Sequence, residues 1–169
     1  MAVRIIVLMG VSGAGKSTVG LALAQRLSWP FEEGDRFHPA ANIEKMKSGR
    51  PLNDADRAPW LSAIAAWIDE ALARGETGVV ACSALKRAYR ERLTAGRPQV
   101  AIVFLEGPKA LIAHRVARRT GHFMPPALLD SQFADLEPPS ADENALVVDV
   151  AQSVEAQVQA IIEGLGLTP

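Results

Sequence analysis

The chain of 169 residues has the length of one ordinary domain, and 49% hydrophobic with 22% charged residues is a globular composition. A formal net charge of −1 excludes the broad basic face that nucleic acids and membrane surfaces attract, so we expect neither partner. No apolar run approaches the length that spans a bilayer, and the chain starts without a separate leader pattern. We therefore expect a single domain over residues 1–169 in the cytoplasm, with the one cysteine, Cys82, as a packed thiol.

Apolar runs predict five strands, which are typical of a sheet covered on both faces because their hydrophobicity is continuous rather than alternating. The expected strands are 3–9, 29–31, 79–82, 100–105 and 145–148, the second being the weakest. Helical patterns lie between them. The expected helices are 16–27, 40–47, 59–73, 85–94, 108–119, 126–134 and 153–164. Pro59 and Pro108 are interpreted as first-turn residues, and Gly75 and Gly164 as helix ends.

Residues 10–18 follow the pattern Gly-x-x-x-x-Gly-Lys-Ser, directly between the first strand and the first helix. Such a loop turns its backbone N–H groups toward phosphate oxygens, and the helix adds its positive end. Lys16 is expected to reach the β- and γ-phosphates, and the Ser17 hydroxyl to bind Mg²⁺. A chance glycine-rich turn is the alternative. The residues expected to bind ATP here are Gly10, Ser12, Gly13, Ala14, Gly15, Lys16, Ser17 and Thr18.

Other classes of nucleotide-binding protein lack support in the sequence. Neither the Asp-x-x-Gly element nor the Asn-Lys-x-Asp element of GTP switches occurs. Motor and transport ATPases usually carry an acid after a later strand, whereas the run 79–82 ends at Ser83. The acids instead follow the second strand, as expected of a small kinase that phosphorylates a hydroxyl group.

Asp35 is the candidate catalytic carboxylate, because strand ends on this side of a parallel sheet face the ligand crevice. It could align an acceptor hydroxyl and take its proton, while Glu33 could hold Mg²⁺ directly or through water. The alternative for Asp35 is an ordinary turn aspartate after Gly34.

The segment 120–140 is rich in proline and contains one short helical stretch, which favours a mobile lid over the phosphates. A plain surface loop is the alternative. Arg118 and Arg119 precede this segment and are expected to contact the ATP phosphates and to stack near adenine.

Several blocks of the chain resemble the gluconate kinases of the shikimate-kinase-like P-loop group. The blocks are Asp-Arg-Phe-His-Pro at 35–39, Asn-Ile-Glu-Lys-Met at 42–46, Gly-Arg-Pro-Leu-Asn-Asp-Ala-Asp-Arg-Ala-Pro-Trp-Leu at 49–61, Cys-Ser-Ala-Leu-Lys-Arg-Ala-Tyr-Arg at 82–90, and the motifs within 121–138. The resemblance covers nearly the whole chain.

This resemblance implies a three-layer α/β P-loop kinase fold with a five-stranded parallel sheet and a lid. It also implies transfer of the ATP γ-phosphoryl group to the 6-hydroxyl of D-gluconate by a homodimer. Shikimate kinases have Asp-x-Asp where this chain has Glu33 and Asp35, so the manner of metal binding by Glu33 stays open.

A sugar acid needs cations for its carboxylate and polar groups for its hydroxyls. Arg57 and the pair Lys86 and Arg90, four apart on an expected helix face, are the candidate carboxylate and phosphate contacts. His38 and His122 are the candidates for sugar hydroxyls. Two other interpretations remain open, a kinase for another small hydroxy acid or a nucleotide, and a non-enzymatic ATP-binding regulator.

Overall fold

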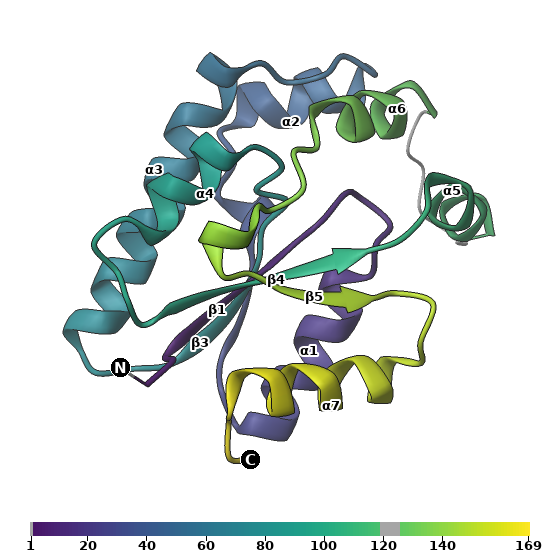
Figure 1. Cartoon of the computed structure of the whole chain (residues 1–169). Helices are drawn as coiled ribbons and strands as arrows, with labels where there is room; N and C mark the ends of the chain where they lie inside the picture. The colour runs from purple at the N-terminus through teal and green to yellow at the C-terminus, as the bar shows by residue number, and fades with distance from the viewer. Residues whose placement is uncertain (1, 119–125) are drawn as a thin grey trace.

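A parallel sheet of five strands runs through the centre of the computed structural model, which describes residues 2–118 and 126–169 (Figure 1). The strands are β1 Ile5–Met9, β2 Phe31–Glu33, β3 Gly78–Ala81, β4 Val100–Glu106 and β5 Leu146–Asp149, in the spatial order β2-β3-β1-β4-β5. All neighbouring pairs are parallel. The five expected strands are confirmed, each within two residues at either end.

Helices cover both faces of this sheet and complete three layers. They are α1 Lys16–Leu27, α2 Ala40–Lys47, α3 Asp54–Ala73, α4 Arg87–Thr94, α5 Lys109–Arg118, α6 Pro126–Asp135 and α7 Val154–Leu165, with short 3-10 helices η1 Gly34–Phe37 and η2 Ala141–Glu143. Helices α1 and α7 lie on one face, and α3 and α4 on the other (Figure 1). Within the described ranges, no helix combines the length and apolarity that crossing a membrane requires.

The two faces of the sheet are packed by separate buried clusters. Side chains alternate along β1, so Ile6 and Leu8 pack with α1 and α7, whereas Ile5, Val7 and Met9 pack with α3 and α4. Every residue of β1 is fully buried. The continuous hydrophobicity of the central strands thus follows from burial on both sides.

Helix α3 begins at Asp54, five residues earlier than the sequence predicted, because Asn53 forms a capping box. The Asn53 side chain accepts a hydrogen bond from the Asp56 backbone N–H at 2.8 Å, and Asp56 accepts one from the Asn53 N–H at 2.9 Å. Pro59 therefore lies inside the helix, and its interpretation as a first-turn residue was wrong.

Two other helix boundaries also differ from the prediction. Helix α4 begins at Arg87 instead of residue 85, since Lys86 has extended backbone angles. Gly164 lies within α7, and Gly166, with a φ of 65°, ends that helix in the left-handed conformation.

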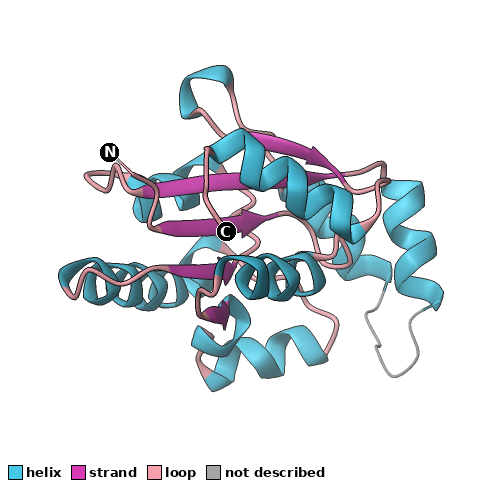
Figure 2. Ribbon diagram, turned by 90° about the horizontal axis from the view of Figure 1, so that it is seen from below, coloured by secondary structure: helices cyan, strands magenta, loops and turns pink. Residues whose placement is uncertain are grey.

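The tight approach of η1 to β3 fixes where the second strand delivers its acids. A Cβ atom at Gly34 would lie 2.2 Å from the Ala81 carbonyl oxygen, so only glycine fits there. The Trp60 indole N–H donates to the Gly34 carbonyl at 2.8 Å and holds the turn from the other side. Asp35, the next residue, is thereby fixed at the carboxyl edge of the sheet. The strand arrowheads in Figure 2 point to this edge, at the end of the molecule where α5 lies.

Candidate active site

A hollow of about 750 Å³ opens at the carboxyl ends of the strands. It is lined by the phosphate loop on one side and by residues of η1, α3 and α6 on the other. Lys16, Ser17, Glu33, Asp35, His38 and Arg57 all face it. These six predicted site residues come from segments far apart in the sequence, and the sheet topology brings them together.

The phosphate loop has the shape that the sequence predicted. Gly13 and Gly15 have φ angles of 86° and 96°, which other residues rarely adopt. Gly13 also packs so closely on α5 that a Cβ atom would lie 2.3 Å from Val116. Helix α1 starts directly after Gly15, which has no side chain to cap it, so the N–H groups of its first turn point into the loop. The Lys16 ammonium donates to the Gly10 and Val11 carbonyls, both at 2.9 Å.

Ser17 and Glu33 form a direct contact in the wall of the hollow, where the Ser17 hydroxyl donates to Glu33 Oε2 at 2.6 Å. A hydroxyl and a carboxylate are oxygen ligands of the kind that Mg²⁺ prefers, and Mg²⁺ commonly takes only one or two from the protein. The described residues contain no cluster of three or more carboxylate, histidine or cysteine ligands. This pair therefore fits a magnesium ion shared with phosphate oxygens and water.

His38 is held rigidly in the wall of the hollow. Its ring stacks on Trp60 with centroids 4.4 Å apart and an interplanar angle of 13°. The Asn42 amide group donates to His38 Nδ1 at 3.1 Å and to the Asp56 carbonyl at 2.8 Å. Nδ1 is thus the acceptor, and in the neutral ring Nε2 carries the proton. Burial lowers the pKa of His38 below its ordinary value, nearby Asp35 opposes this and Arg57 adds to it, so the ring is neutral near pH 7.

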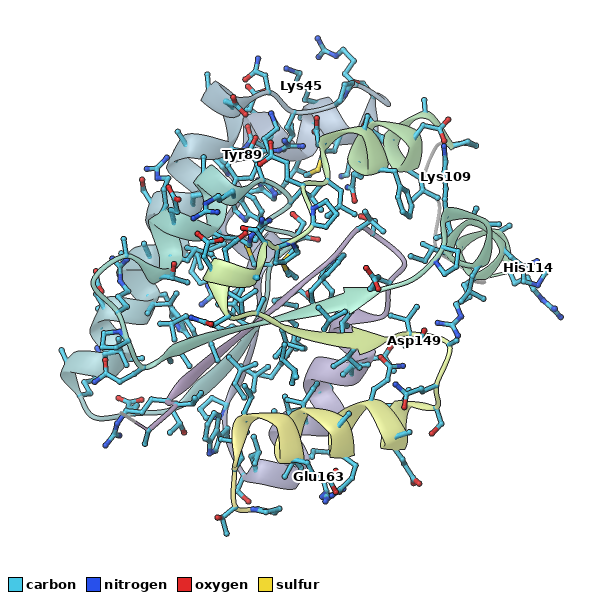
Figure 3. The ribbon with its side chains drawn as sticks, viewed as in Figure 1. Lys45, Tyr89, Lys109, His114, Asp149 and Glu163 are labelled. Carbon is cyan, nitrogen blue, oxygen red and sulfur yellow. The ribbon has the colours of Figure 1, made fainter. Side chains whose placement is uncertain are left out.

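Arg57 lies in the same wall, 8% exposed, with its guanidinium anchored by two partners. Its Nη1 donates to the Tyr89 hydroxyl at 2.9 Å and lies 3.0 Å from Asp135 Oδ2. Tyr89, labelled in Figure 3, reaches from α4 to α3, where its hydroxyl donates to Asp54. Tyr89 and Asp135 were missed because no local pattern links them to Arg57.

Neither Lys86 nor Arg90 is among the residues that line the substrate hollow. Lys86 precedes α4, and its ammonium lies 3.2 Å from Asp54. Arg90 is buried, and its guanidinium binds Glu143 at 2.6 Å as well as the Ala84 and Leu85 carbonyls. Arg90 thus uses its donors on groups inside the protein, and the described contacts give no support to the expected contact between Arg90 and substrate.

Helix α6, which lies within the expected lid segment, contacts the phosphate loop directly. The Gln132 side chain accepts from the Ser12 backbone N–H at 2.7 Å, and its amide nitrogen donates to the Ser12 hydroxyl at 3.1 Å. Leu128 and Ser131 line the hollow beside it. Gln132 is part of the motif at 121–138, but no local pattern links it to its partner Ser12. Arg119 and His122, predicted for ATP and substrate, lie outside the described residues.

A second hollow of about 470 Å³ lies on the other side of the phosphate loop, between α1, α5 and α7. Gly13, Gly15 and Thr18 line both hollows, so the two adjoin across the loop. Arg118, predicted to contact ATP, lines the smaller one. His114, one turn earlier on α5, projects away from the sheet in Figure 3 and lies 3.4 Å from Arg118.

A phosphate loop and a facing carboxylate on a doubly covered parallel sheet define a P-loop kinase. A family model described as an AAA domain matches residues 5–139. The structure is similar to a shikimate kinase from Bacteroides thetaiotaomicron with a TM-score of 0.67, and the alignment covers 97% of this chain and 99% of that one. At 21% identity this similarity concerns the fold alone.

Closer relatives identify the family within that class. A gluconokinase from Gluconobacter oxydans is 46% identical over 159 residues, which cover 94% of this chain and 89% of the relative. A crystal structure of a gluconokinase from Sinorhizobium meliloti is 49% identical, with a TM-score of 0.86 and coverage of 96% of this chain and 91% of that one. The chain belongs to the gluconokinase family.

Proposed function

We propose that this protein transfers the γ-phosphoryl group of ATP to the 6-hydroxyl of D-gluconate, giving 6-phosphogluconate and ADP. The observation that carries the proposal is the shared hollow. It brings the phosphate loop, a carboxylate at a strand end and a buried arginine together in a chain of the gluconokinase family.

ATP is proposed to lie across the phosphate loop with its γ-phosphate in the larger hollow and its base in the smaller one. The loop N–H groups and the start of α1 would hold the β-phosphate, and Lys16 would exchange its carbonyl contacts for phosphate oxygens. Arg118 would cover the base or reach the phosphates, because a guanidinium both stacks on rings and binds oxyanions.

Mg²⁺ is proposed to bind at Ser17 and Glu33, whose oxygens already lie together. When bound, the ion neutralises phosphate charge and orients the phosphates. Glu33 reaches the ion directly or through one water, since Mg²⁺ usually keeps several of its waters.

Gluconate is proposed to occupy the space between His38, Arg57 and Asp35. The Arg57 guanidinium suits the carboxylate, and its anchoring by Tyr89 and Asp135 keeps it in place before substrate arrives. The His38 Nε2–H suits a sugar hydroxyl. Lys86 lies near this region, because its ammonium donates to Asp54 and lies over the ring of Tyr89, and it remains a proposed carboxylate contact. His122 remains a proposed contact for a sugar hydroxyl.

Asp35 is proposed to align the 6-hydroxyl and to accept its proton. The new bond forms between that oxygen and the γ-phosphorus while the bond between the γ-phosphorus and the bridging oxygen of ADP breaks. Lys16 balances the charge on the moving group, and no covalent intermediate with the protein is needed.

Three further proposals concern the lid, the oligomeric state and the compartment. Closure of the segment 120–140 over the phosphates is supported by the position of α6 in the wall of the hollow. A homodimer is proposed from the family resemblance. The cytoplasm is the proposed compartment, in keeping with the single buried thiol of Cys82, whose pKa is raised to about 12 by burial.

The test is ADP release measured with gluconate, shikimate and nucleoside monophosphates as separate acceptors. Gluconate should stimulate release and the others should not, and NMR of the product should locate the phosphate on the 6-oxygen. Asp35→Asn should lower turnover by about 10²–10³. The control Asp69→Asn, which changes an exposed aspartate paired with Arg97, should leave turnover unchanged. A near-native rate for Asp35→Asn would remove its role, and equal activity without gluconate would refute the substrate.

A further inference from the structure

Gln157, on α7, carries a buried polar atom that the protein does not satisfy. The residue is 3% exposed. Among the described residues, its side-chain oxygen Oε1 is the one buried polar side-chain atom that has no hydrogen-bond partner. A buried acceptor without a donor costs free energy, so one that is retained calls for an explanation. The proposed function gives this atom no role.

The orientation of this amide group is fixed by its other end. Gln157 Nε2 donates to the Gln152 carbonyl at 3.0 Å, so the nitrogen and oxygen positions are not interchangeable. Gln152 lies in the turn between β5 and α7, where the Ala151 N–H donates to Asp149 Oδ1 at 2.9 Å. The turn thus holds the nitrogen and leaves the oxygen as an unused acceptor.

Gln157 also lies in the wall of the smaller hollow, together with Val154, Arg118 and the glycines of the phosphate loop. Two hollows described here adjoin the phosphate loop, and the other one contains Asp35 and Arg57 and is assigned to the acceptor, so we assign the rest of the nucleotide to this one. The wall combines apolar surface, the arginine side chains of Arg115 and Arg118 and, in Gln157, an acceptor whose hydrogen bond is unused. A flat heterocycle that carries an amino group matches all three.

We propose that Gln157 determines base specificity by accepting a hydrogen bond from the 6-amino group of adenine. This inference rests on the proposed function only in placing ATP on the phosphate loop. A 6-oxopurine presents an acceptor at the same position, which would face the Gln157 oxygen without a proton between them. Such a base leaves two acceptors unpaired and binds more weakly.

The test compares ATP with ITP, which differ in the base only by the 6-amino and 6-oxo groups. Displacement of a fluorescent ADP analogue from the full chain, measured without any acceptor, gives both dissociation constants. The wild-type protein should favour ATP by about tenfold, and Gln157→Met should reduce that ratio to about one to three. The matched control is Gln159→Met, because Gln159 lies on the same helix but pairs at the surface with Arg26 and Glu163.

The ratio separates recognition from structure. If Gln157 served only to hold the turn, its loss would weaken ATP and ITP equally and leave the wild-type ratio unchanged, which would overturn the proposal. A wild-type protein that does not distinguish the two nucleotides would overturn it as well. Thermal unfolding of both variants shows whether each has folded, and Gln157→Asn serves as a second variant with a shortened acceptor if the methionine variant has not. Because no gluconate is present, failure here is distinct from failure of gluconate-dependent ADP release.

Discussion

The ion pair between Arg90 and Glu143 offers the sharpest test of what the structure says about the basic residues of α4. The two side chains are 2% and 11% exposed, and the guanidinium binds both carboxylate oxygens at 2.6 and 3.1 Å. Glu143→Gln keeps the shape of the side chain and removes its charge. The amide oxygen can still accept one hydrogen bond, but the buried Arg90 guanidinium loses its counter-charge and keeps only neutral partners, among them the Ala84 and Leu85 carbonyls.

The expected loss of stability is large for a single isosteric change. Removing one partner of a buried pair costs about 3–5 kcal/mol, because the remaining charge is left uncompensated. We take the lower end, about 3 kcal/mol, since the partly exposed carboxylate position lets water solvate the amide and part of the guanidinium. For a chain of this size that loss corresponds to a fall of about 6–12 °C in Tm.

The assay is urea unfolding at neutral pH, together with the KM for gluconate. Glu143→Gln should unfold at lower urea with KM unchanged, and Arg90→Met combined with Glu143→Leu should recover part of the loss. Asp142→Asn is the control, because Asp142 lies beside Glu143 but forms an exposed pair with Arg87 and should change unfolding little. Wild-type stability with a raised KM in Glu143→Gln would refute the structural role and return Arg90 to the substrate site.

Three further predictions concern the hollow. Arg57→Met should raise the KM for gluconate by about ten- to a hundredfold, which corresponds to about 1.5–3 kcal/mol of lost charged hydrogen bonding; unchanged steady-state kinetics would exclude Arg57 from the pocket. Glu33→Gln should raise the Mg²⁺ concentration needed for half-maximal rate with little change in the KM for gluconate, as a magnesium titration of initial rates would show, and an unaltered titration would contradict the assignment. For His38, the folded state binds a proton less readily than the unfolded chain, whose pKa is near 6.5, so its contribution to stability is present above that pH and is lost as the pH falls from there through the lower pKa of the folded state. Urea unfolding at about pH 7.5 and about pH 5.5 should therefore show a smaller acid loss in His38→Gln than in the wild type, and equal losses would show that the ring is not held neutral.

The sequence determined the order and type of the elements, because their signals are local. Residues 10–18 predict the loop from the steric freedom of glycine and from the position of Lys16 and Ser17. The apolar runs predict strands buried on both faces. Helix ends were less certain: Pro59 suggested a start for α3, whereas the Asn53 capping box, which satisfies the first N–H groups, places it earlier.

The tertiary structure decided which charged groups serve the site, because a guanidinium has the same local signature whether it faces a hollow or a buried carboxylate. Arg57 meets Asp135, which lies 78 positions further along the chain, and Arg90 meets Glu143, and only packing separates a substrate contact from an internal brace. The unused acceptor of Gln157 is likewise a product of packing, because its helix α7 lies against α1 in the fold and the side chain is buried there. Local sequence therefore determined the phosphate loop and the sheet, and long-range burial determined which side chains remain available to a ligand.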